Sequence, residues 1–142
     1  MPVRVKLRIR SQRGETVEAP ALINSGYEAE KPELLLPLAA AMDLGLWPPE
    51  RMGYEYAHTP VGMGRLYALG EVAEAKVIAE DKDTPSISVY VMVSEYEREI
   101  LISDYLAGAL GLAVEDFKEG LWRFNDEPLS KVRRSEKPRY WP

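Results

Sequence analysis

Apolar and charged residues alternate strictly at the start of the chain, and no other feature constrains the fold as strongly. Every second position there is apolar, at Val3, Val5, Leu7 and Ile9. The positions that alternate with them are basic. Successive side chains of a strand point to opposite faces, so this period of two predicts a strand with one buried face. Residues 87–93 repeat the alternation. We therefore expect a chain built mainly from β-strands.

Shorter signals predict the remaining elements. Further strands are expected at 16–23 and 100–102, and in a terminal hairpin of 112–115 and 121–124, and residues 34–36 are expected to form a short buried run. A first short helix is expected over 37–44, because proline favours a helix start and Gly45 can end it. A second is expected over 104–110, with Ser103 as its N-cap. Residues 71–80 fit a helix by propensity and a strand by context.

Composition limits the class of protein. The chain has 142 residues, enough for one domain, and 46% are hydrophobic, which excludes wholesale disorder. It has no cysteine, and His58 is its only histidine, so neither a metal site nor a cofactor is predicted. No apolar run approaches the ~18 residues of a membrane-spanning helix, and residues 1–6 do not resemble a secretory signal. We expect a cytoplasmic protein.

Charge is distributed unevenly along the chain. Residues 14–130 carry eight basic against 22 acidic side chains, a balance of −14, whereas residues 1–13 and 131–139 are basic. The overall acidity makes nucleic acid an unexpected partner. The basic end can pair with the acidic body or contact an anionic surface. We expect a domain over 1–124 and a basic tail over 125–142. One glutamine and two asparagines beside 23 acidic residues are typical of hyperthermophile proteins.

Two segments carry related series of motifs. In residues 21–46, Ala-Leu-Ile-Asn-Ser-Gly precedes an acidic loop, Leu-Leu-Leu-Pro, a short helix and Leu-Gly-Leu. In residues 100–114, Ile-Leu-Ile-Ser-Asp-Tyr-Leu precedes a short helix and Leu-Gly-Leu. This order and spacing resemble the retropepsin-like aspartic proteases, the single-domain family that includes the retroviral proteases. The family has glycine at the position of Ser103.

The resemblance covers residues 3–124 and implies a fold, a site and an assembly. It implies an all-β closed sheet with two short helices, in which the strands ending at Asn24 and Ile102 lie side by side. It places the catalytic position at Asn24, Ser25 and Gly26, where the serine hydroxyl braces the loop. It places substrate-binding residues beside that loop and in a flap over 58–65: Tyr27, Val61, Gly62, Met63 and Gly64. It also implies a homodimer that holds an extended peptide.

Asn24 departs from the family, whose members have aspartate at this position. In those enzymes each of two subunits supplies one aspartate, and the pair shares a proton and acts as base and acid on a water. Asparagine has no titratable proton near neutral pH, so the chain as it stands is not expected to hydrolyse peptides. The change is either natural or a substitution that silences an enzyme. Two functions remain: a peptidase scaffold that needs aspartate at position 24, and a non-catalytic peptide-binding or regulatory module.

Several polar residues near these motifs also have simpler interpretations. Asn-Ser-Gly after a strand is an ordinary turn sequence. Glu28, Glu30 and Glu33 can supply a substitute carboxylate or bind a cation, and a solvated acidic loop is the simpler reading. His58 is expected in a loop, and Asp104 beside a helix start interacts favourably with the helix dipole.

Overall fold

The computed structural model describes residues 2–49, 53–59 and 62–142. Within those ranges strands far outnumber helices, as the alternation predicts. The elements in chain order are β1 (Arg4–Ser11), β2 (Thr16–Ile23), β3 (Glu33–Pro37), α1 (Leu38–Asp43), β4 (Gly53–Thr59), β5 (Gly62–Val77), β6 (Ile87–Ser94), β7 (Ile100–Ile102), α2 (Asp104–Ala109), β8 (Leu112–Asp116), β9 (Leu121–Phe124) and β10 (Arg133–Arg134). Both helices lie where they are expected, and each is slightly shorter than predicted.

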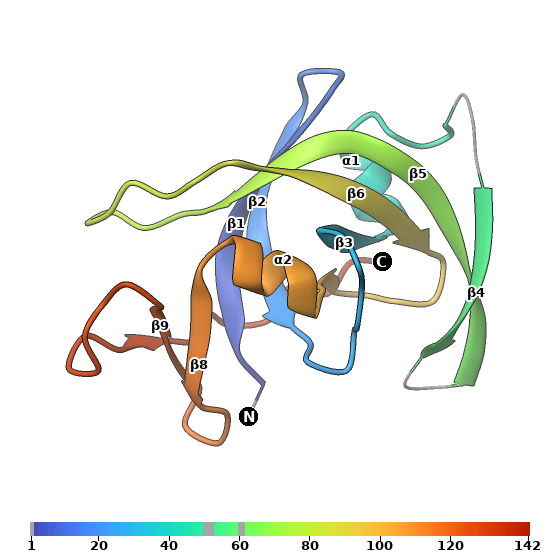
Figure 1. Cartoon of the computed structure of the whole chain (residues 1–142). Helices are drawn as coiled ribbons and strands as arrows, with labels where there is room; N and C mark the ends of the chain where they lie inside the picture. Colours follow the sequence, from blue (N-terminus) through green and yellow to red (C-terminus); the bar gives the residue numbers. More distant parts are fainter. Residues whose placement is uncertain (1, 50–52, 60–61) are drawn as a thin grey trace.

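Six strands of the described chain close into a barrel. Hydrogen-bonded neighbours follow the order β1-β2-β7-β3-β6-β5, and β5 pairs with β1 to complete the ring. β4 pairs with β5 outside this ring, so the β4–β5 hairpin projects from the barrel (Figure 1). The order β10-β9-β8 describes a second, small sheet. The expected all-β closed sheet is therefore confirmed.

The strand crossing implied by the resemblance lies in the middle of the sheet order. β2 and β7 run parallel, with Ala21 opposite Ile100 and Ile23 opposite Ile102. β3 lies on the other side of β7, antiparallel to it and parallel to β6. Parallel neighbours end at the same edge of a sheet. The residues that follow Ile23 and Ile102 therefore meet at that edge.

The barrel interior is filled by the apolar face that the alternation predicts. The four apolar residues at the start of the chain are fully buried: Val3, Val5, Leu7 and Ile9. Lys6, Arg8 and Arg10 on the other face are exposed, as the alternation predicts. Arg4 is the exception: it is buried, and its Nε pairs with Glu99 Oε1 at 2.6 Å. Burying one such aliphatic side chain stabilises a fold by about 1.5–3 kcal/mol, so this strand is strongly held in its register.

Most of residues 71–80 form the end of β5, which settles the choice between helix and strand. β5 is 16 residues long and pairs in turn with β4, β6 and β1. Its register against β6 shifts between Ala68 and Gly70 and again between Glu71 and Ala73. Gly70 has a φ of 86°, a conformation that favours glycine, and such irregularities bend a strand. Partner strands along β5 outweigh the helical propensity of its sequence.

The segment over 125–142, in which the sequence shows little periodicity, packs along the barrel. β10 adds to β9. Glu136 then donates its backbone N–H to the Arg4 carbonyl at 2.9 Å. Trp141 is 3% exposed and donates its backbone N–H to the Arg98 carbonyl at 2.7 Å. A buried indole and backbone hydrogen bonds thus attach this segment to the folded core.

Two basic side chains of this segment share two carboxylates, Asp81 in the body and Glu127 in the segment itself. Arg133 contacts Asp81 and Glu127, with nitrogen–oxygen distances of 2.8 Å to each. Lys131 contacts the same two carboxylates. These two charges are therefore used within the chain, which is the first of the two interpretations that the sequence leaves open.

Candidate functional site

The turn after β2 carries the catalytic position that the sequence predicts. Tyr27 donates its backbone N–H to the Asn24 carbonyl at 3.0 Å, which closes the turn. Gly26 donates its backbone N–H to Asn24 Oδ1, also at 3.0 Å. Asparagine side chains stabilise turns in this way, so the local sequence accounts for the conformation. Asn24 is half-buried, whereas Ser25 and Gly26 are exposed.

The end of β7 and the start of α2 hold this turn in place. Asn24 donates its backbone N–H to the Ile102 carbonyl at 3.3 Å. Asp104 donates its backbone N–H to the Tyr27 carbonyl at 2.8 Å, and its Oδ1 accepts the Ala29 N–H at 2.9 Å. The two related segments of the sequence therefore form one hydrogen-bonded unit.

Ser103 stands where the family has glycine, and its hydroxyl has two partners. It donates to the Glu33 carbonyl at 2.7 Å and accepts the Leu106 N–H at 3.2 Å. The second bond is the predicted N-cap of α2, and the first ties α2 to β3. The Ser25 hydroxyl, expected to brace the loop, makes no hydrogen bond within the part of the chain that the structure describes. Within the chain, Asp104 holds the turn through the Tyr27 carbonyl and the Ala29 N–H.

The three glutamates after the turn have different surroundings. Glu28 and Glu30 are exposed. Glu33 begins β3 and accepts a hydrogen bond from the Tyr27 hydroxyl at 2.9 Å, so it is not part of a freely solvated loop. Among the side chains that the structure describes, those of residues 2–49 and 65–142, no three His, Cys, Asp or Glu residues are grouped as a metal site requires.

Apolar side chains line up on the face of the sheet opposite the main core. Strand register places one residue each from β2, β7, β3, β6 and β5 in a row: Leu22, Leu101, Leu35, Met92 and Ala68. We call these five residues the apolar row. They belong to a cluster separate from the main core, into which their sequence neighbours point. Leu35, Met92 and Leu101 are less than a tenth exposed.

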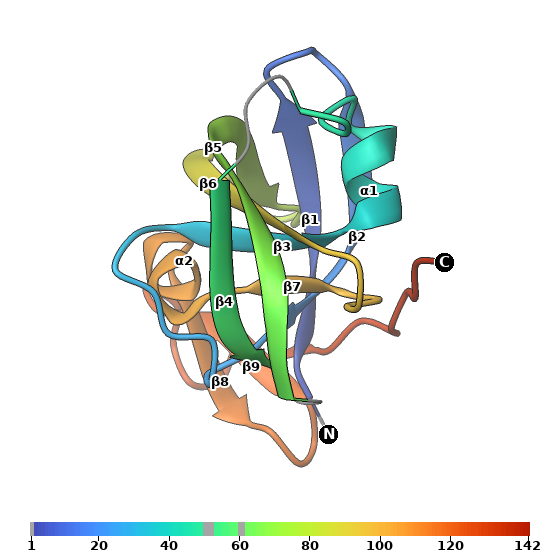
Figure 2. The same ribbon diagram turned by 90° about the vertical axis from the view of Figure 1, so that its right-hand side faces the viewer.

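The β4–β5 hairpin stands over this face of the sheet, in front of β3 and β7 (Figure 2). Leu66 of β5 and Tyr27 of the turn pack against the apolar row. The ladder continues to the tip through three backbone pairs: Ala57–Gly64, His58–Met63 and Thr59–Gly62. The expected hairpin is therefore present. His58 lies in strand β4 and not in a loop, because strand pairing continues almost to the tip. Val61 and the side chains of 53–59 and 62–64 lie outside the described residues.

Sequence reasoning did not identify the apolar row as part of a site. Its signal is two uninterrupted apolar runs, at 34–36 and 100–102. A strand buried on one face alternates, whereas a continuous run indicates two buried faces. Which runs become neighbours depends on pairing between distant segments, so the row itself appears only in the folded chain.

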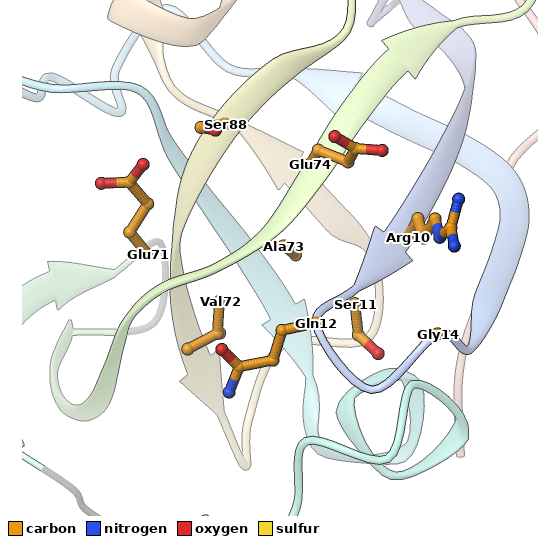
Figure 3. A pocket seen from close by; sticks show the side chains of 9 residues that line it. All are labelled: Arg10, Ser11, Gln12, Gly14, Glu71, Val72, Ala73, Glu74 and Ser88. Carbon is orange, nitrogen blue, oxygen red and sulfur yellow. The ribbon is translucent and has the colours of Figure 1, made fainter.

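A separate hollow of about 370 Å³ opens where β1, β5 and β6 meet (Figure 3). Its lining is largely polar and charged, with Arg10 and Glu71 on opposite sides in that view. No site residue predicted from the sequence lines it, and its mixed charges favour no single class of ligand. The candidate site is therefore the unit formed by the Asn24 turn, the apolar row and the hairpin.

Comparison of the chain with models of known protein families and with curated protein sequences finds no match. The candidate site therefore rests on its own geometry and on the order of the sequence motifs. Within the described residues, none of the helices has the length and apolar character needed to cross a membrane.

Proposed function

We propose that this chain is a retropepsin-like protein that holds an extended peptide between the apolar row and the β4–β5 hairpin. One observation carries the proposal. The Asn24 turn and the start of α2, which contain the two motifs of the resemblance, are hydrogen-bonded to each other beside the apolar row. Two distant segments that meet in this way support the assignment more strongly than either short motif does.

The proposed binding mode follows from the shape of an extended peptide. Such a peptide binds a sheet through main-chain hydrogen bonds, and its alternate side chains enter pockets or apolar contacts. The apolar row offers such contacts across five strands. Because most of the row is buried beneath its neighbours, the hairpin has to lift to admit a peptide. The ligand is therefore a peptide with apolar side chains on one face.

The proposed function excludes hydrolysis by the chain as it stands. Peptide hydrolysis in the family needs a pair of carboxylates that shares one proton. General acid–base catalysis contributes roughly 10²–10⁴-fold in rate, and Asn24 in both copies removes both partners. The chain is therefore a binding module on a peptidase scaffold, and peptidase activity needs aspartate at position 24.

We also propose that two copies associate through the Asn24 turn. Ser25 and Gly26 are exposed at the tip of that turn, where a second copy can reach them. Near the two chain ends, by contrast, the Glu136 N–H is hydrogen-bonded to the Arg4 carbonyl within the same chain. Self-complementary two-fold contacts are the commonest geometry of small oligomers.

A peptide library tests the proposed binding. Random peptides of about eight residues, acetylated and amidated at their ends, are passed over the immobilised chain. We expect retained peptides to carry apolar residues at alternate positions, because alternate side chains of an extended peptide point to the same side.

Two leucine variants test whether the apolar row is the binding surface. Leu22→Gln places an amide in the row and is expected to weaken binding of a retained peptide about tenfold. Leu112→Gln is the matched control, because Leu112 is also a half-buried strand leucine but lies outside the row. Retention of no peptide, or equal weakening by both variants, would contradict the proposal.

A further inference from the structure

Asn24 presents hydrogen-bond donors at the candidate site. A backbone N–H can only donate, so the side-chain atom that faces the Gly26 N–H at 3.0 Å is the carbonyl oxygen Oδ1. The other branch of the side chain is therefore the Nδ2 amide, with two N–H donors. Within the described residues, Nδ2 has no hydrogen-bond partner.

The turn keeps this orientation. Gly26 lets its N–H approach the asparagine closely, since a Cβ at position 26 would lie 3.3 Å from Oδ1. If the amide group rotated, Nδ2 would face the Gly26 N–H. Two donors would then face each other and the hydrogen bond would be lost. An aspartate at position 24 would instead present a second oxygen, which is an acceptor. This site therefore offers hydrogen-bond donors where a carboxylate site would offer acceptors.

Resting on the proposed function, we infer that Asn24 Nδ2 donates a hydrogen bond to a backbone carbonyl oxygen of an uncut, internal stretch of peptide. Every extended peptide carries such neutral acceptors. The local charge disfavours a free C-terminal carboxylate, because Glu28 and Glu30 are exposed in the same loop and Asp104 is bonded to its backbone. The ligand is therefore held by an internal carbonyl group.

A scan of peptide carbonyls tests this inference. A peptide that the natural chain retains from the library is remade as analogues, in each of which one carbonyl group is replaced by methylene. We expect one analogue to bind the natural chain about tenfold more weakly, since it lacks the acceptor. Asn24→Leu has no donor, so the same replacement is expected to cost it clearly less affinity than it costs the natural chain.

Asn24→Asp tests whether Asn24 bonds the peptide or has only a structural role in the turn. A purely structural role would leave the preference between the parent peptide and its analogue unchanged. The methylene analogue contains a secondary amine, which is protonated near neutral pH and attracted by a carboxylate. At about pH 7.5, above the acidic range of a carboxylate pair, we expect this variant to prefer the analogue to the parent peptide. Asn125→Leu changes the only other asparagine, which is exposed, and should keep the preference of the natural chain.

The outcomes separate this inference from the proposed function. The inference is overturned if all analogues bind the natural chain alike, or if both Asn24 variants keep its order of preference. If thermal unfolding shows that Asn24→Leu does not fold, the test rests on Asn24→Asp. A preference of that variant for the analogue over the parent peptide then supports the inference, and a preference for the parent peptide overturns it. A natural chain that retains no peptide overturns the proposed function itself, and this inference with it.

Discussion

At the scale of single residues, the turn after β2 tolerates either an amide or a carboxylate at position 24. The Gly26 N–H needs an acceptor oxygen, and both asparagine and aspartate supply one. The conformation of the turn is therefore compatible with either of these two side chains. The two side chains differ only in their second branch, which is the Nδ2 amide in asparagine and a carboxyl oxygen in aspartate. Only the carboxyl group can take up and release a proton in acid–base catalysis.

Asn24→Asp is expected to produce a peptidase. Two carboxylates brought together by association of two chains share one proton, and their titration belongs to the pair. Hydrolysis should therefore have a mildly acidic optimum and be blocked by hydroxyl-containing mimics of the tetrahedral intermediate. Cleavage of a peptide library, followed by mass spectrometry, measures it.

Asn24→Ala is the control for this experiment, because it removes the amide and supplies no carboxyl group. It should cleave nothing. If Asn24→Asp folds and associates yet cleaves no peptide between about pH 3 and 7, the peptidase-scaffold reading is wrong and the binding-module reading remains.

At the scale of elements, the start of α2 depends on one buried hydroxyl. Ser103 caps the helix through the Leu106 N–H and ties it to the Glu33 carbonyl. Ser103→Ala removes both bonds, and we expect the free energy of unfolding to fall by about 1–2 kcal/mol in urea. Ser88→Ala, at an exposed strand serine, should change it by less than about 0.5 kcal/mol. Equal effects of the two changes would refute the assigned role.

The C-terminal segment depends on a single aromatic side chain. Trp141 is buried in the main core, and its Nε1 has no hydrogen-bond partner in the described residues, which offsets part of its stabilisation. We expect Trp141→Ala to lower the free energy of unfolding by about 3 kcal/mol and to speed hydrogen exchange at the Glu136 amide. Tyr140→Ala removes an exposed neighbour and should do neither. Unchanged exchange at Glu136 in Trp141→Ala would show that the indole does not anchor the segment.

At the scale of the whole molecule, Arg133 of the C-terminal segment forms ion pairs with Asp81 of the body and with Glu127 of the segment itself. Hydrogen bonds from Arg133 lower the pKa of Glu127 from 4.5 to about 2, and they also hold the pKa of Asp81 below its ordinary value. A carboxyl group whose pKa is lowered by folding stabilises the fold above its ordinary pKa, and this stabilisation is lost as the pH falls through the folded value. For Glu127, stability should decline between about pH 4.5 and 2.

Arg133→Gln should reduce this acid-dependent part of the stability. We expect a lower free energy of unfolding near neutral pH and a flatter decline below about pH 4.5, measured by urea unfolding at a series of pH values. Arg134→Gln is the matched control, because Arg134 is the exposed neighbour of Arg133 and makes no ion pair in the described part of the chain. Identical pH profiles for the two variants would contradict the prediction.

Association of two copies is also a property of the whole molecule. Light scattering at micromolar concentration should give twice the chain mass of 16.0 kDa. Ser25→Arg places a bulky charge at the tip of the Asn24 turn and should shift the mass to that of one chain. Ser88→Arg, at an exposed position on β6, should not. A mass of 16.0 kDa for the natural chain would exclude the proposed dimer at that concentration.

Local features of this protein follow from the sequence alone. The alternation at the start of the chain predicts β1 and its buried face, and Ser103 predicts the start of α2. Asn-Ser-Gly predicts the turn that follows β2. These features depend on side-chain periodicity and on hydrogen bonds between residues a few positions apart, so the information needed lies within each segment.

Only the tertiary structure decided the features that join distant segments. The apolar row requires β2, β7, β3, β6 and β5 to be neighbours in a particular register. The strand conformation of residues 71–77 requires partners on β6 and β1, and the burial of Trp141 requires the barrel surface beside Arg98. Burial and strand pairing depend on which remote surfaces meet. A one-residue change of register would turn each side chain of the apolar row to the opposite face of the sheet.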